Sequence, residues 1–114
     1  MSISNVREYF KQFGKEDSIL EFEQSSATVE LAAEAAGVIP ARIAKTLSFK
    51  IGDDAILIVT AGDAKIDNKK YKAEFNCKAK MLAPEEVLEF TGHAIGGVCP
   101  FGLKNSLKVY LDDS

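Results

Sequence analysis

The spacing of apolar residues in the first third of the chain predicts two helices separated by a strand. Apolar side chains recur at helical spacing through residues 5–13. In residues 18–23 they stand two apart, the period of a half-buried strand. An alanine-rich stretch at 29–36 follows Thr28, a good N-cap, and stops at Gly37, so it predicts a second amphipathic helix.

The centre of the chain predicts a β-hairpin. Residues 45–51 and 55–61 are rich in apolar and β-branched residues, and a Gly-Asp-Asp turn joins them. Turn and cap residues indicate the elements that follow: a short turn at Pro40 before the hairpin, a helix after Asp67 that reaches about Phe75, a strand near 78–82, a helix at 85–91 opened by Pro84 and ended by Gly92, and a strand at 107–111. No repeat or low-complexity linker interrupts the pattern, so we predict one domain spanning 1–114.

Composition narrows the class of protein. The chain has 114 residues, a formal charge of −3 and 46% hydrophobic residues, enough for one buried core. Its longest purely apolar run, residues 55–59, is far shorter than the ~20 residues that cross a bilayer. The first residues lack the basic start and apolar stretch of a secretory signal. We therefore expect a cytoplasmic protein that does not associate with membranes.

The cysteine and histidine content argues against disulfide and metal chemistry. Two cysteines without a dense spacing pattern do not indicate a disulfide scaffold. A single histidine without a Cys-x-x-Cys pair supplies too few ligands for zinc. We assign no metal.

A glycine-rich segment is the first candidate for chemistry. Residues 96–102 contain three glycines and a proline in a chain that has few of either. Such a loop can bring backbone N–H groups close to a carboxylate, a phosphate or the oxyanion of an ester under attack. The alternative is a tight turn between strands. The segment matches neither common nucleotide-binding glycine pattern, so we expect no NTPase or dehydrogenase and assign no cofactor.

Lys45 is the second candidate, because it stands at the beginning of a predicted core strand. Strand alternation places Lys45 on one face and its neighbours Ala44 and Thr46 on the other. Its ammonium could hold a phosphate or the polar end of a substrate. The alternative is an edge lysine whose amine reaches water.

Basic charge is segregated in residues 65–80. Six lysines and two carboxylates give this segment a net charge of +4, although the whole chain carries −3. A local basic face suits a salt-sensitive contact with a nucleic acid backbone, and a solvated helix face is the alternative.

Cys99 and His93 raise a third chemical hypothesis. A thiol beside an imidazole base is the arrangement of cysteine hydrolases. A free cysteine is more often a small buried apolar residue.

Taken together, four ordered motifs make the sequence similar to the YbaK/EbsC family of aminoacyl-tRNA deacylases, relatives of the editing domain of bacterial prolyl-tRNA synthetases. The motifs are Ser-Ser-Ala-Thr-Val-Glu at 25–30 before an alanine-rich helix, Ile-Ala-Lys-Thr-Leu at 43–47, Gly-Asp-Ala-Lys-Ile-Asp at 62–67 followed by two lysines, and Thr-Gly-His at 91–93 leading to Gly102.

The resemblance implies an α+β fold: a mixed, mainly antiparallel, curved and barrel-like sheet surrounded by helices. It implies hydrolysis of the ester of a mischarged tRNA in trans, assisted by the substrate and with no protein nucleophile. The residues that it implies for this reaction are Lys45, Gly96 and Gly97 in catalysis, and Phe22, Thr46, His93, Val98, Cys99 and Pro100 in substrate binding. The basic segment adds Lys65, Lys69, Lys70 and Lys72 as tRNA-binding residues.

Two departures from the family pattern affect these expectations. Phe22 stands where some members have a pocket tyrosine, so their amino acid preference does not transfer. The family continues past Ser114 with a strand, a glycine turn and a helix, so we predict a C-terminally truncated domain whose last strand has an exposed edge that can pair with a second copy. The alternative function is a non-catalytic module that binds tRNA or an aminoacyl-tRNA synthetase.

Overall fold

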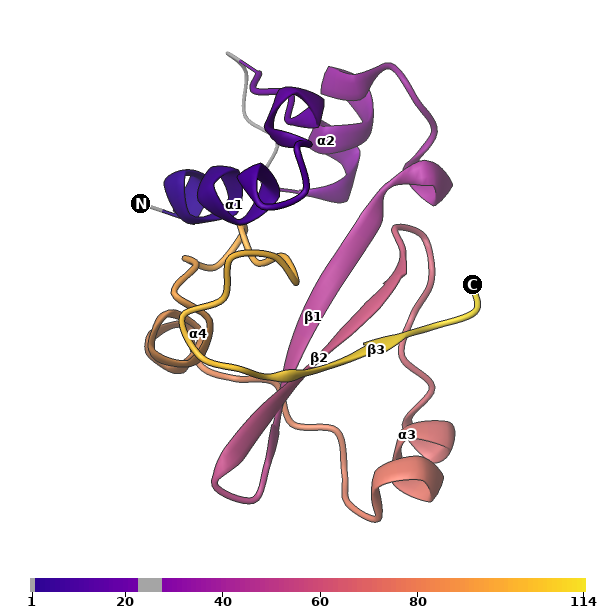
Figure 1. Cartoon of the computed structure of the whole chain (residues 1–114). Coiled ribbons are helices and arrows are strands. Elements are labelled where there is room, and N and C mark those ends of the chain that lie inside the picture. Colours follow the sequence, from indigo (N-terminus) through magenta and orange to yellow (C-terminus); the bar gives the residue numbers. More distant parts are fainter. Residues whose placement is uncertain (1, 23–27) are drawn as a thin grey trace.

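The computed structural model describes residues 2–22 and 28–114, and all structural statements below concern these residues (Figure 1). In chain order the elements are α1 (Ser2–Lys11), the 3₁₀ turn η1 (Glu16–Ser18), α2 (Val29–Ala36), the 3₁₀ turn η2 (Pro40–Arg42), β1 (Ala44–Ile51), β2 (Asp54–Ala61), α3 (Asn68–Phe75), α4 (Pro84–Thr91) and β3 (Lys108–Leu111). The predicted hairpin, α2, α3 and α4 are confirmed. The first helix lies at 2–11 instead of 5–13, because the residues after Lys11 form turns.

The helix ends follow the local signals in the sequence. The Thr28 hydroxyl accepts a hydrogen bond from the Leu31 N–H at 3.2 Å and caps α2. At the other end of α2, Gly37 is left-handed and the Val38 N–H donates to the Ala33 carbonyl, as in a Schellman motif. The short helices therefore carry their own start and stop signals.

The sheet is mixed and open. β1 pairs antiparallel with β2, from Ala44 opposite Ala61 to Ile51 opposite Asp54. β3 pairs with the other edge of β2 in parallel, so the strand order is β1-β2-β3. The α+β class is confirmed, but neither the barrel-like closure nor a mainly antiparallel sheet is confirmed among the described residues. The three strands are too few to close a barrel, since even the small OB-fold barrel has five.

Two predicted strands are absent as strands from the described residues. The described part of 18–23 begins in η1, where i to i+3 hydrogen bonds use the N–H groups of Ser18 and Ile19; residue 23 lies outside the described residues. The 78–82 segment forms a single antiparallel bridge, Met81 opposite Phe49. Its pairing stops because α4 begins at Pro84.

The hairpin separates two groups of buried side chains. On one face, Phe49, Ile56 and Ile58 pack with Tyr71 of α3. On the other face, Ala55 packs with Leu82 and with Val87 of α4. Strand alternation accounts for the division, because residues of one parity share a face. Figure 1 accordingly shows α3 and α4 on different sides of the hairpin.

Gly62, directly after β2, lets the segment that contains α2 and η2 lie against the hairpin. A Cβ at this position would come within 2.3 Å of the Pro40 carbonyl oxygen and 2.7 Å of Val29 Cγ1. Only a glycine permits this approach. The contact fixes α2 and η2 over the end of the sheet where β1 begins.

Candidate active site

A cleft of about 400 Å³ lies where α2, the first half of β1 and the loop after α4 meet. Of its described lining residues, only Lys45 has a charged side chain. The others are mostly apolar or small: Thr28, Val29, Ala32, Ile43, Ala44, Thr46, Leu47, Ser48, Met81, Leu82, Val87, Ile95, Gly96, Gly97 and Val98. The cleft therefore has walls suited to an uncharged group.

The edge of β1 that faces away from β2 differs between its two halves. In the second half, the Lys50 N–H donates to the Lys80 carbonyl at 2.8 Å and the Ser48 carbonyl accepts from the Leu82 N–H at 3.3 Å. Alternation along the strand directs the N–H and C=O of Thr46 to the same edge, where they have no partner among residues 2–22 and 28–114. An unpaired stretch of strand thus borders the cleft.

Lys45 lines the cleft, and its ammonium is bound within the protein. It pairs with Thr60 across the hairpin, and its Nζ donates to the carbonyl of Ala64, in the loop after β2. The predicted alternation is confirmed: Lys45 shares a face with Leu47 and Phe49, opposite to Thr46. A ligand that binds this amine must share it with the Ala64 carbonyl or replace that contact.

The loop after α4 supplies the opposite wall of the cleft through Gly96, Gly97 and Val98. The Gly97 N–H donates to the Ala94 carbonyl at 2.9 Å, so it is used within the turn. The N–H groups of Gly96 and Val98 have no acceptor in the described part of the chain. These two amides, rather than that of Gly97, are available to a developing oxyanion.

His93 and Cys99 lie in the loop but do not line the cleft. His93 is fully buried, and its Nε2 lies 2.8 Å from the Phe101 carbonyl oxygen. Because a carbonyl only accepts, this Nε2 carries the proton. The Cys99 Sγ lies 3.7 Å from the same nitrogen and donates to the same carbonyl. Burial raises the pKa of the Cys99 thiol, which disfavours the nucleophilic thiolate.

The structure therefore brings together part of the predicted site. Lys45, Thr46, Gly96, Gly97 and Val98 line one cleft, whereas Phe22, His93, Cys99 and Pro100 are not among its described lining residues. Sequence reasoning missed the apolar lining, chiefly Val29, Ala32, Met81, Leu82, Val87 and Ile95, because apolar residues in helices and short strands carry no motif that distinguishes a cleft from a core.

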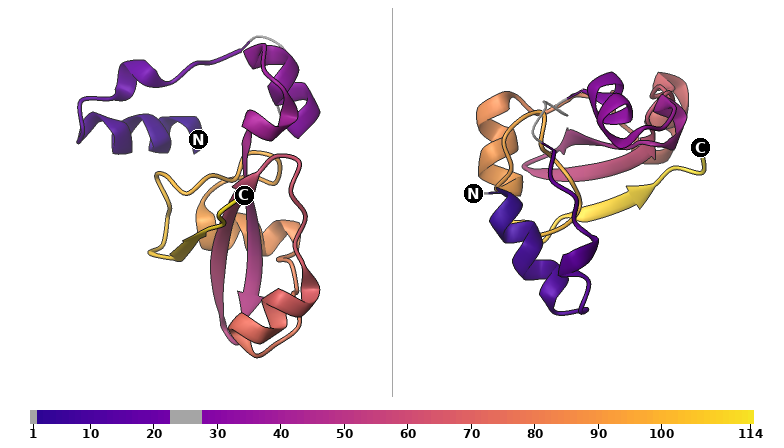
Figure 2. Two further views of the ribbon diagram at one scale, coloured as in Figure 1. Left: turned by 90° about the vertical axis from the view of Figure 1, so that its right-hand side faces the viewer. Right: turned by 90° about the horizontal axis from the view of Figure 1, so that it is seen from above.

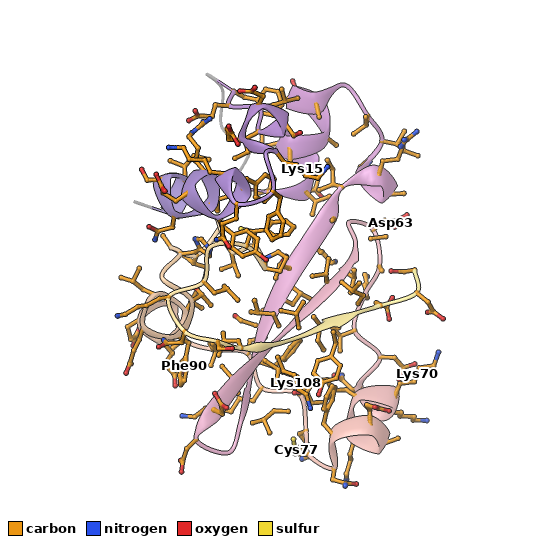
Figure 3. All side chains as sticks on the ribbon, in the orientation of Figure 1. Lys15, Asp63, Lys70, Cys77, Phe90 and Lys108 are labelled. Carbon is orange, nitrogen blue, oxygen red and sulfur yellow. The ribbon has the colours of Figure 1, made fainter. Side chains whose placement is uncertain are left out.

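The predicted tRNA-binding lysines divide between two hollows. Lys69 and Lys72 line one of about 410 Å³ with Lys78, and its described lining contains no carboxylate. Lys65 and Lys70 line another of about 630 Å³, whose lining includes the carboxylates of Asp67, Glu74, Asp112 and Asp113. Figure 3 shows Lys70 on the side of α3 toward the C-terminal tail. Only the first hollow is uniformly basic.

The described residues contain neither a membrane-spanning helix nor a cluster of metal ligands. No helix there is both long and apolar enough to cross a membrane. Nor do three or more histidine, cysteine, aspartate or glutamate side chains gather there in a group that could hold a metal ion.

Comparison with known proteins finds relatives of this chain among tRNA-editing proteins. The family described as "Aminoacyl-tRNA editing domain" matches residues 23–114. "Uncharacterized protein YwhH" of Bacillus subtilis is 62% identical over 115 residues, which cover all of this chain and 73% of that protein. The "Putative Cys-tRNA(Pro)/Cys-tRNA(Cys) deacylase EbsC" of Enterococcus faecalis is 32% identical, over 79% of this chain and 56% of that protein.

A solved structure and a synthetase sequence support the same family. A structure described as "a putative trans-editing enzyme for prolyl tRNA synthetase" superposes with a TM-score of 0.86 at 33% identity and covers 97% of this chain and 71% of that one. The proline–tRNA ligase of Thermotoga maritima shares 31% identity with 67% of this chain, over 13% of its own length. Residues 23–114 contain the whole cleft, and by this match the chain belongs to the aminoacyl-tRNA editing domain family.

Proposed function

We propose that this protein hydrolyses the ester of mischarged aminoacyl-tRNA in trans. The observation that carries the proposal is the convergence of Lys45 and Thr46 with Gly96–Val98 on one cleft, although about fifty residues separate the two segments. The cleft belongs to a chain of the editing family, and its mainly apolar walls can exclude bulk water around an ester.

In the proposed reaction, a water oxygen bonds to the ester carbonyl carbon and the bond from that carbon to the ribose oxygen breaks. The amides of Gly96 and Val98 stabilise the oxyanion that forms between these steps. Lys45 orients the polar end of the substrate and gives up or shares its contact with the Ala64 carbonyl. A group of the substrate takes the proton from water, as the family resemblance implies, and the leaving ribose oxygen is protonated. The released products are the free amino acid and the tRNA.

Lys65, just before α3, and three lysines of α3 are the proposed contact with the tRNA backbone. Lys65, Lys69, Lys70 and Lys72 are all exposed. We expect Lys69 and Lys72 to contribute most, because the described lining of their hollow contains no carboxylate that would compete with phosphate.

The second candidate is a non-catalytic module that binds tRNA or a synthetase. A specific observation favours it: both the Lys45 amine and the Gly97 amide, groups that the family resemblance assigns to the reaction, are already bound to carbonyls of the chain. The cysteine hydrolase is disfavoured by the geometry, since the His93 Nε2–H that points toward Phe101 cannot also accept the Cys99 proton.

The test is turnover of a panel of mischarged tRNAs by the 114-residue protein, its Lys45→Ala variant and a matched control, Lys108→Ala, which changes an exposed lysine on β3. We expect the parent and the control to release amino acid from at least one substrate, and Lys45→Ala to lose about 100-fold in kcat/KM, typical for one positioned electrostatic group. Binding of tRNA without turnover by the parent would support the non-catalytic module.

A further inference from the structure

The loop that forms one wall of the cleft is closed at its base. The Lys104 N–H donates to the Thr91 carbonyl at 3.0 Å, and the Asn105 side-chain amide donates to the carbonyls of Glu89 and Phe90. Residues 92–104 therefore form a compact loop with adjacent ends, of the Ω type. These hydrogen bonds fix the two ends of the loop. The position of the rest of the loop over the cleft is set by contacts of residues within the loop.

Phe101 is held from both sides. Inside the loop, its carbonyl accepts from the buried His93 ring and from the Cys99 thiol. Outside the loop, its ring lies 4.9 Å from the ring of Phe10 in an edge-on arrangement and 6.0 Å from that of Tyr9. Both rings belong to α1, which lies over this loop in Figures 1 and 2. Phe101 thus joins the loop interior to the first helix.

Gly102 brings the backbones of the loop and α1 into direct contact. Its φ is +62°, and a Cβ here would come within 2.7 Å of the Asn5 carbonyl and 2.8 Å of the Val6 nitrogen. The helix and the loop are therefore packed backbone to backbone beside an aromatic cluster. Such packing restricts loop movement more than side-chain contact alone.

We infer that α1 is a positioning element for the cleft: through Tyr9, Phe10 and Phe101 it holds the Gly96–Val98 wall in place. α1 precedes residues 23–114, so it lies outside the part of the chain that the editing family matches. Phe10 and Phe101 are positioning residues, since they do not line the cleft. The effect on turnover rests on the proposed deacylation, whereas the effect on the loop does not.

The two cysteines provide a test that is independent of turnover. Cys99 is part of the loop, whereas Cys77 lies beyond α3 in the other core (Figure 3). In Phe10→Ala at fixed pH we expect iodoacetamide to alkylate Cys99 about two- to tenfold faster, the range expected for the loss of one aromatic pair. The alkylation rate of Cys77 should be unchanged. The kcat for mischarged tRNA should fall by a similar factor, with a smaller change in KM.

Phe13→Ala is the matched control. The Phe13 ring packs at a tilt against Tyr9, with ring centroids 5.4 Å apart, and has no ring contact to Phe101. It should change neither the Cys99 alkylation rate nor kcat. Should Phe10→Ala fail to fold by circular dichroism, Phe10→Leu is used, with a smaller effect expected in the same direction. An unchanged Cys99 rate in a folded Phe10 variant, or equal acceleration at Cys77, would overturn the inference. A parent without turnover would overturn the proposed deacylation and leave the thiol rates to decide the role of α1.

Discussion

The two faces of the hairpin are formed by the same strands but are covered by different elements. The face toward α3 is filled by rings: Phe49, Tyr71, Phe75 and Tyr110 form a chain with centroid separations of 4.6–5.1 Å. The face toward α4 has a smaller core and opens into the cleft at the first half of β1. The same sheet thus has a ring-filled core on one side and an open cleft where β1 begins.

The open face results from where the chain turns. The segment that covers the outer edge of β1 reaches only Leu82, because Pro84 begins α4 and directs the chain away. The α2 segment and the loop at 95–98 then form walls around the uncovered part without filling it. The cleft exists because the segment on the outer edge of β1 stops at Leu82, whereas β2 pairs with β1 along its whole length.

Phe49→Ala should have the largest effect on this comparison. Phe49 is 2% exposed and lies at one end of the chain of rings, against Tyr71. Removal of such a side chain costs about 3–5 kcal/mol, a large share of the stability of a small domain. Urea unfolding measures the loss. Thr46→Ala, in the half of the same strand that borders the cleft, should cost less than about 1 kcal/mol. Equal losses at the two positions would mean that the two faces contribute alike to stability.

The second prediction separates the four proposed tRNA-binding lysines, which lie on α3 and just before it, by their surroundings. Lys69→Gln combined with Lys72→Gln should weaken tRNA binding and reduce the slope of log K against log salt by about 2, because each lysine that contacts phosphate contributes about 1. The matched pair Lys65→Gln and Lys70→Gln, which shares its hollow with carboxylates, should change the slope less. Titration of tRNA at several salt concentrations measures both. Identical slopes for the two double variants would contradict the expected difference in tRNA binding between the two pairs of lysines.

The smallest effect concerns Cys99 and pH. Burial raises the pKa of this thiol, so the folded state favours the neutral form. Its contribution to stability is complete below the pKa of an unfolded thiol, about 8.5, and is lost as pH rises through the folded pKa. The melting temperature should therefore fall slightly more between pH 8 and pH 10 in the parent than in Cys99→Ser. A Cys77→Ser control shows whether the other thiol has the same effect on the change of melting temperature with pH.

The sequence by itself determined the local structure and the main site segments of this protein. Thr28 and Asp67 mark helix starts because their side chains bond N–H groups two or three residues away, and the Gly-Asp-Asp turn needs no distant partner. The ordered motifs predicted that Lys45 and the glycine loop belong to one site, and both line the same cleft. These signals can be read along the chain because each depends on neighbours in sequence or on a pattern of residue types.

The tertiary structure decided the rest. Three contacts join residues that come together only when the chain folds back on itself: the parallel pairing of β3, the single bridge at Met81 and the contact of Lys45 with Ala64. Folding likewise decided that His93 and Cys99 do not line the cleft. Such contacts depend on which apolar faces pack together. Burial of any of these faces lowers the free energy by a similar amount for the same area, so the sequence pattern does not select among them. Local patterns therefore predicted the helices, the hairpin and the last strand, but also strands at 18–23 and 78–82 that the described residues do not form. Packing alone selected the partners of these elements, the open edge of β1 and the helix that holds the loop.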